Sequence, residues 1–68
     1  MNAARLKYEM GMRNVTPAIL CEALKISKSA FYRKLNGTSE FTQSEIQKIV
    51  DFLGLDSPVG IFFTEKVS

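Results

Sequence analysis

The apolar residues of this chain recur at intervals of three or four positions, the spacing that amphipathic helices produce. Between the apolar runs stand residues that commonly begin or end helices, such as Thr16, Ser27 and Gly37. The pattern predicts five helices and no strand, and therefore an all-α fold. The expected helices cover residues 2–12, 17–24, 28–35, 43–53 and 58–63, followed by a frayed tail over residues 64–68.

The segment 16–37 carries the most informative part of this pattern. Thr16 can cap a helix that has proline at its first position, and Ser27 can cap a second helix that begins at Lys28. Only three residues separate Leu24 from Lys28, so the two helices must meet at a steep angle. This geometry predicts a helix-turn-helix.

The second helix of that unit has two different faces. Phe31 and Leu35 point to one side, while the other side carries only cations and hydrogen-bond donors. The outward residues are Lys28, Ser29, Tyr32 and Arg33. A basic helix surface with short polar side chains fits the major groove of DNA. Lys34 lies nearer the apolar side, where its stem is expected to cover Phe31.

Charge is concentrated on the same segment. The formal net charge is only +2, from nine basic and seven acidic residues. Residues 1–22 carry three basic and two acidic groups, residues 23–39 carry four basic and none acidic, and residues 40–68 carry two basic and five acidic. This distribution favours a polyanionic partner at the helix-turn-helix.

Several classes of function are disfavoured by composition. The 68 residues suit one domain, 1–68, and one cysteine, Cys21, excludes an internal disulfide. With no histidine, the usual zinc sites are not expected, nor is a nucleophilic Cys21, so we expect no metal, no cofactor and no enzyme. No apolar run has the length of a signal peptide or a membrane span, which indicates a cytoplasmic protein without membrane contact.

The helix faces also predict the core. Its expected members are Leu6, Leu20, Leu24, Phe31, Leu35, Ile46, Ile49, Leu53 and Phe62, and the same stripe includes Ile19. Met10, Met12, Cys21 and Phe41 are expected to be buried as well. Ile61, Phe62 and Phe63 cannot all point inward from one short helix. We expect the surplus to form a self-association surface, with partial burial as the alternative.

Taken together, these motifs resemble the Cro/cI-type helix-turn-helix family, the five-helix domains of phage repressors and related bacterial regulators. The resemblance covers residues 16–63 and rests on Thr16, Leu20–Cys21, Ile26–Ser27, Asn36–Gly37, Leu53–Gly54–Leu55 and Ile61–Phe62–Phe63. Two positions depart from the family pattern. Pro17 replaces a frequent glutamine that clamps phosphate, and Lys25 replaces a frequent glycine at the turn, where a positive φ costs roughly 1 kcal/mol.

The resemblance implies roles for particular residues. Base contacts would fall on Lys28, Ser29, Tyr32 and Arg33, and DNA-backbone contacts on Thr16, Ser27, Asn36, Gly37, Thr38 and Ser39. Some of the phosphate contacts would come from backbone N–H groups of residues 36–38. For Arg33, readout of guanine is favoured over a solvated surface charge. Lys28 could contact either a base or a phosphate.

The leading functional hypothesis is a sequence-specific regulator of transcription that binds a double-stranded DNA operator as a homodimer, most similar to a phage or prophage Cro-like repressor. No ligand-sensing module is expected, and therefore no small-molecule ligand. The alternative is a protein-interaction module of the same fold, such as an antitoxin-like or regulator-docking domain. Retention on duplex DNA that depends on salt would separate the two hypotheses.

Overall fold

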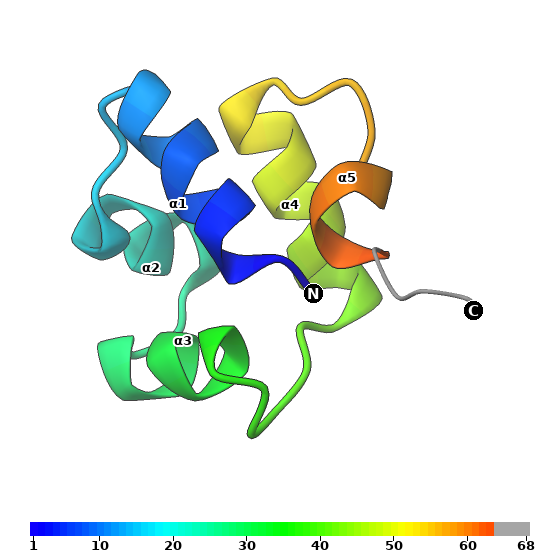
Figure 1. The fold of residues 1–68 in the computed structure, drawn as a ribbon. Helices are drawn as coiled ribbons and strands as arrows, with labels where there is room; N and C mark the ends of the chain where they lie inside the picture. The colour runs from blue at the N-terminus through cyan, green and yellow to red at the C-terminus, as the bar shows by residue number, and fades with distance from the viewer. Residues whose placement is uncertain (64–68) are drawn as a thin grey trace.

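A computed structural model describes residues 1–63, and these residues form five helices and no strand (Figure 1). The helices are α1 (Ala3–Met12), α2 (Pro17–Leu24), α3 (Lys28–Leu35), α4 (Gln43–Leu53) and α5 (Val59–Phe62). The all-α prediction is confirmed, whereas the tail expected over residues 64–68 lies outside the described residues. No helix in the described part of the chain is long and apolar enough to cross a bilayer.

The first four helices begin where the sequence predicts, because each has a side-chain cap. The capping residues are Asn2, Thr16, Ser27 and Thr42. Each cap oxygen accepts a hydrogen bond from the backbone amide three residues later, at 2.9–3.2 Å. At α4 the cap is reciprocal, since the Glu45 carboxylate accepts from the Thr42 amide at 2.9 Å.

One helix boundary differs from the prediction. Helix α1 ends at Met12 as expected, and Asn14 takes the left-handed conformation (φ 56°) that follows the helix end. The last helix begins at Val59 instead of at Pro58 and ends at Phe62. The Ser57 hydroxyl still accepts from the Val59 amide at 3.1 Å, so the expected serine is present as a local cap.

The core lies where the faces of the five helices meet. Its fully buried side chains are Leu6, Leu20, Phe31 and Ile49. Helix α2 packs against both α3 and α4, and α1 packs against α5. The amide of Asn2 donates to the carbonyl of Ile61 at 2.7 Å, so the chain start is joined to the last helix, as Figure 1 shows.

The burial of four apolar residues differs from the expectation. Met12 is 63% exposed and Ile19 is 43% exposed, because each lies on the outer side of its helix. Leu35 and Ile46 are only half-buried, although both pack against the core. Two other expected core residues, Met10 and Cys21, are buried. The apolar stripes were placed correctly along the chain, and the errors concern residues at their margins.

The end of α5 divides its apolar side chains between core and surface. Ile61 and Phe62 are buried, whereas Phe63 is 55% exposed. Ile61 and Phe62 therefore cannot form a self-association surface, because the monomer already buries them. Only Phe63 of the three remains available for contact with another molecule.

An aromatic chain connects α3 to α5 across the core. The Phe31 and Phe41 rings pack edge to face with their centres 6.1 Å apart. The Phe41 and Phe62 rings pack in the same way with their centres 5.6 Å apart. Edge-to-face pairs of this kind add stabilisation beyond the area that they bury. Phe41 is buried as predicted, and its position between the other two rings explains why the loop before α4 lies close to the core.

A charged cluster joins α1 to the end of α4. The Glu9 carboxylate pairs with Arg5 at 2.7 Å and with Arg13 at 2.5 Å. Arg13 also donates to the carbonyl oxygen of Leu53, the last residue of α4. The last carbonyl groups of a helix have no partner within the helix, so Arg13 satisfies one of them. Hydrogen bonds from Arg5 and Arg13 lower the pKa of Glu9 below its ordinary value of 4.5.

Replacing Leu20 by Ala should lower the free energy of unfolding by about 2–5 kcal/mol, because the side chain is fully buried between helices. Urea denaturation followed by circular dichroism measures this loss. Ile19→Ala, one position away on the exposed side of α2, is the matched control and should cost less than about 1 kcal/mol. Equal losses for both variants would show that the buried face of α2 has been misassigned.

Replacing Glu9 by Gln should destabilise the protein at pH 7, since two arginines lose their shared carboxylate. The lowered pKa means that Glu9 stabilises the fold above pH 4.5 and that this contribution is lost as the pH falls through its folded-state pKa. The stability gap between wild type and variant should therefore shrink below pH 4.5. Melting curves over pH 2.5–7 test this, with the exposed Glu22→Gln as control. A gap that stays constant across that range would contradict it.

Candidate nucleic-acid interface

The turn between α2 and α3 keeps the left-handed geometry that a helix-turn-helix requires. Lys25 ends α2 with φ 61° and ψ 44°, and the amide of Ile26 donates to the carbonyl of Cys21 at 3.1 Å. A lysine at positive φ costs about 1 kcal/mol relative to glycine, and the packing of α2 on α3 offsets that strain. Lys25 therefore adopts the left-handed conformation that glycine favours at this position.

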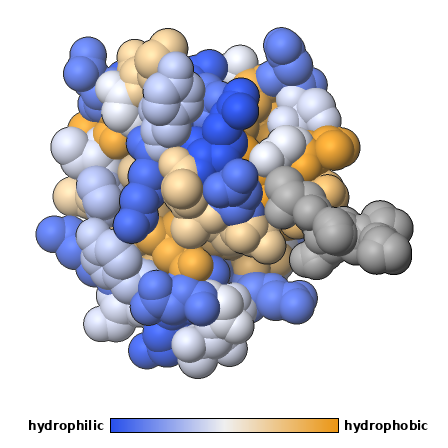
Figure 2. All heavy atoms as spheres, viewed as in Figure 1, coloured by the Kyte–Doolittle hydropathy of each residue, from blue (hydrophilic) through white to orange (hydrophobic). Residues whose placement is uncertain are grey.

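The outer face of α3 is the exposed polar surface that the sequence predicts. All four proposed base-contact residues are exposed, and they are Lys28, Ser29, Tyr32 and Arg33. Tyr32 is 43% exposed, and the centres of the Tyr32 and Phe31 rings lie 5.6 Å apart in an edge-to-face arrangement. In Figure 2 the area over α3 and the following turn, at the bottom of the view, is hydrophilic. The structure thus brings the four side chains to one accessible surface.

The cap residues of α2 and α3 lie at the edges of this surface. Thr16 and Ser27 are exposed, and each hydroxyl oxygen already accepts a hydrogen bond from its own helix. A hydroxyl can still donate its proton while it accepts, so both residues retain a donor for a phosphate oxygen. The two predicted backbone contacts at the helix starts are therefore geometrically accessible.

The turn after α3 is closed by hydrogen bonds of its own backbone amides. The amides of residues 36–39 all donate to carbonyl oxygens in the last turn of α3, at 2.9–3.3 Å. The phosphate contacts of the N–H groups of residues 36–38 stay a prediction, and in the structure without DNA these groups are paired with the helix end. Asn36 and Thr38 are exposed and Ser39 is half-buried, so their side chains could reach the DNA backbone.

Lys34 is withdrawn from the cationic surface. Its Nζ lies 2.6 Å from Glu45 Oε1 and 2.9 Å from Oε2, and 5.8 Å from the centre of the Phe41 ring. Burial raises the pKa of Glu45, but hydrogen bonds from Lys34 and the Thr42 amide outweigh it and leave that pKa lowered. The sequence places Lys34 near the core but gives no sign of its pairing with Glu45, because residues 11 positions apart give no local signal.

Three cations remain on the helix-turn-helix without an ion pair among residues 1–63, namely Lys25, Lys28 and Arg33. All three are exposed. The segment 23–39 therefore presents three available positive charges instead of the four that the sequence contains. This still leaves a locally cationic face suited to a polyanion.

Cys21 lies behind this surface in the core. Burial raises the pKa of its thiol, and the positive charge of Lys28 offsets only part of this effect. The thiol group is within 3.9 Å of the Ser27 carbonyl oxygen. A buried thiol with a raised pKa is a poor nucleophile, which agrees with a packing role for Cys21.

An exposed helix with a polar outer face, joined by a short turn to a capped partner helix, defines a helix-turn-helix of the kind that enters the major groove. A family model of the Cro/C1-type HTH DNA-binding domain matches residues 5–58. The chain belongs to this family, as the sequence resemblance indicated. No curated protein and no solved structure matches the chain significantly.

Replacing Lys28 or Arg33 by Ala should weaken binding to duplex DNA, since each variant removes an exposed and unpaired cation of α3. Arg33→Ala should also relax the preference at one base pair by roughly 1–3 kcal/mol. Fluorescence anisotropy with a set of single-base operator variants measures both effects. Lys48→Ala, an exposed cation on α4, is the control and should change binding little. Equal weakening on every operator variant would make Arg33 a phosphate contact.

Proposed function

We propose that this protein is a sequence-specific transcriptional regulator, a Cro-like repressor of phage or prophage type, that binds a double-stranded DNA operator. One observation carries the proposal: α3 buries Phe31 completely and exposes four polar or cationic side chains on its opposite face. A helix held in this way can enter the major groove without rearrangement.

In the proposed mechanism, Arg33 makes paired hydrogen bonds to a guanine, and Ser29 and Tyr32 contact neighbouring base edges. Lys28 lies at the first position of α3 and contacts a base or the adjacent phosphate. The hydroxyls of Thr16 and Ser27 and the side chains after α3 fix the register on the DNA backbone. Occupancy of an operator that overlaps a promoter then excludes polymerase.

The experiment that tests this function is selection of bound fragments from a random duplex library, followed by affinity measurements at several salt concentrations. A specific regulator should enrich one motif, and log affinity should fall linearly with log salt at a slope of about −0.9 per neutralised phosphate. Salt-independent binding, or no enrichment of any motif, would overturn the proposal. It would favour the protein-interaction module as the function of this fold.

We further propose that two copies act together on the operator. One recognition helix covers only a few base pairs, which is too little sequence to single out a site in a genome. Support for pairing comes from the exposed apolar side chains of Val59 in α5 and of Phe63 directly after it, which are 58% and 55% exposed. Phe63 also lines a shallow hollow with the apolar residues Ile46 and Pro58, and the other residues that line this hollow are Gln43, Ser44 and Gln47. Half-sites should then lie about one helical turn apart, roughly 34 Å.

Replacing Phe63 by Asp should leave the fold intact, because the side chain is exposed, and should lower affinity for the full operator by roughly 100-fold. Affinity for a single half-site should barely change. Gel-shift titration on full and half operators measures the difference. Met12→Asp adds the same charge at an exposed apolar residue of α1 and is the control. A Phe63 variant that keeps wild-type affinity for the full operator would show that this surface does not pair.

A further inference from the structure

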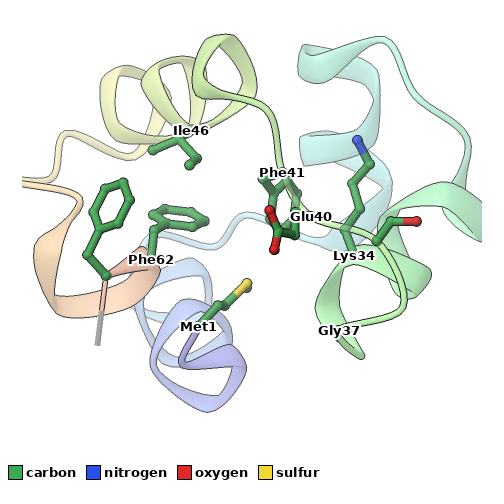
Figure 3. A pocket seen from close by; sticks show the side chains of 9 residues that line it. Met1, Lys34, Gly37, Glu40, Phe41, Ile46 and Phe62 are labelled. Carbon is green, nitrogen blue, oxygen red and sulfur yellow. The ribbon is translucent and has the colours of Figure 1, made fainter. Parts of the chain in front are cut away.

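Lys34 differs from the other cations of the helix-turn-helix in its surroundings. Its side chain is 14% exposed and that of Glu45 is 15% exposed, so the ion pair between them is largely shielded from water. Figure 3 shows the Lys34 side chain beside Phe41, at the end of a groove whose other end is formed by Met1 and Phe62. The charge of Lys34 thus points into the protein, although it belongs to the helix that faces DNA.

The partner of Lys34 is itself held in place. Glu45 is the third residue of α4, and its Oε1 atom accepts from both the Thr42 amide, at 2.9 Å, and Lys34, at 2.6 Å. The Thr42 hydroxyl accepts from the Glu45 amide in return, at 3.1 Å. One carboxylate therefore closes the start of α4 and anchors the last turn of α3. The two helices are linked at the point where the turn 36–39 leaves α3.

We propose that Lys34 and Glu45 are positioning residues for DNA recognition: their ion pair fixes the angle of α3 against α4, and neither residue contacts DNA. This inference rests on the proposed sequence-specific binding by α3. Helix α3 also contacts the core through apolar side chains, since Phe31 meets the Phe41 ring edge to face and Leu35 packs against the core. Hydrogen bonds depend on angle, so the ion pair constrains the direction of α3 more narrowly than these apolar contacts do. Removing one partner of a shielded pair leaves the other charge uncompensated, so the single variants are expected to be less stable than wild type. The positioning role is therefore tested by the sequence preference, measured at a temperature at which each variant is folded.

The first arm of the test asks whether Lys34 touches DNA. Lys34→Met keeps the apolar stem over Phe41 and removes the charge. Its salt slope on random-sequence duplex should equal that of wild type, whereas Lys28→Met should lose up to about 0.9 from the slope. Lys48→Met, exposed on α4, controls for the change in net charge. A slope for Lys34→Met that falls as far as that of Lys28→Met would overturn the proposal, since Lys34 would then be a phosphate contact.

The second arm measures the ratio of affinities for the selected operator and for random duplex. This ratio should fall about fivefold or more in Lys34→Met, the size of one mismatched base pair. Glu45→Gln can still accept from the Thr42 amide and breaks only the ion pair, so it should show the same loss. Glu40→Gln removes an exposed carboxylate from the loop between α3 and α4 and should leave the affinity ratio unchanged. Lys34→Arg keeps the positive charge and should have the affinity ratio of wild type.

The outcomes distinguish this inference from the proposed function. Wild-type protein that binds every duplex equally would overturn the function itself. Wild-type selectivity together with an unchanged ratio in Glu45→Gln and in folded Lys34→Met would overturn only the positioning role. Circular dichroism at the assay temperature establishes that each variant is folded, and Glu45→Gln decides the result if Lys34→Met is not.

Discussion

The burial of Phe31 is the constraint on which the rest of this structure depends. Its ring is completely enclosed, and the helix geometry then places residues 28, 29, 32 and 33 on the solvent side. Phe31 packs edge to face on Phe41, and this contact fixes the position of the loop before α4. Phe41 packs in turn on Phe62, which fixes the position of α5. The proposed DNA-contact surface is thus a consequence of core packing, since α3 cannot rotate without exposing Phe31.

Electrostatics follows the same division between inner and outer groups. Two of the acidic residues, Glu9 and Glu45, are held in ion pairs with arginines or lysine and have lowered pKa values. These pairs tie helix ends together, α1 to α4 in one case and α3 to α4 in the other. The cations that remain unpaired on the segment 23–39 are all at its surface. The positive charge available for a partner therefore depends on which cations are free of ion pairs, and the net charge does not show this.

The fold was largely predictable because its signals are local. Caps such as Thr16 and Thr42 stand directly before apolar runs of helical period, and each satisfies amides of its own first turn. The candidate base contacts followed from the face opposite Phe31. What could not be predicted depends on contacts between distant segments. The Lys34–Glu45 pair spans 11 positions, and the use of the amides of residues 36–39 within α3 depends on how that helix ends.

The short last helix supplies buried side chains to the core, and the residue that follows it leaves an apolar side chain exposed on the surface. A chain of this length buries only part of its apolar surface, so each short helix must supply core. Ile61 meets this need and also accepts the hydrogen bond from Asn2, which closes α1 against α5. A four-residue helix has no second full face, and the next side chain, Phe63, is consequently left outside. The position of the proposed pairing surface is therefore set by the geometry that completes the core, and pairing would cover the apolar surface that one copy cannot hide.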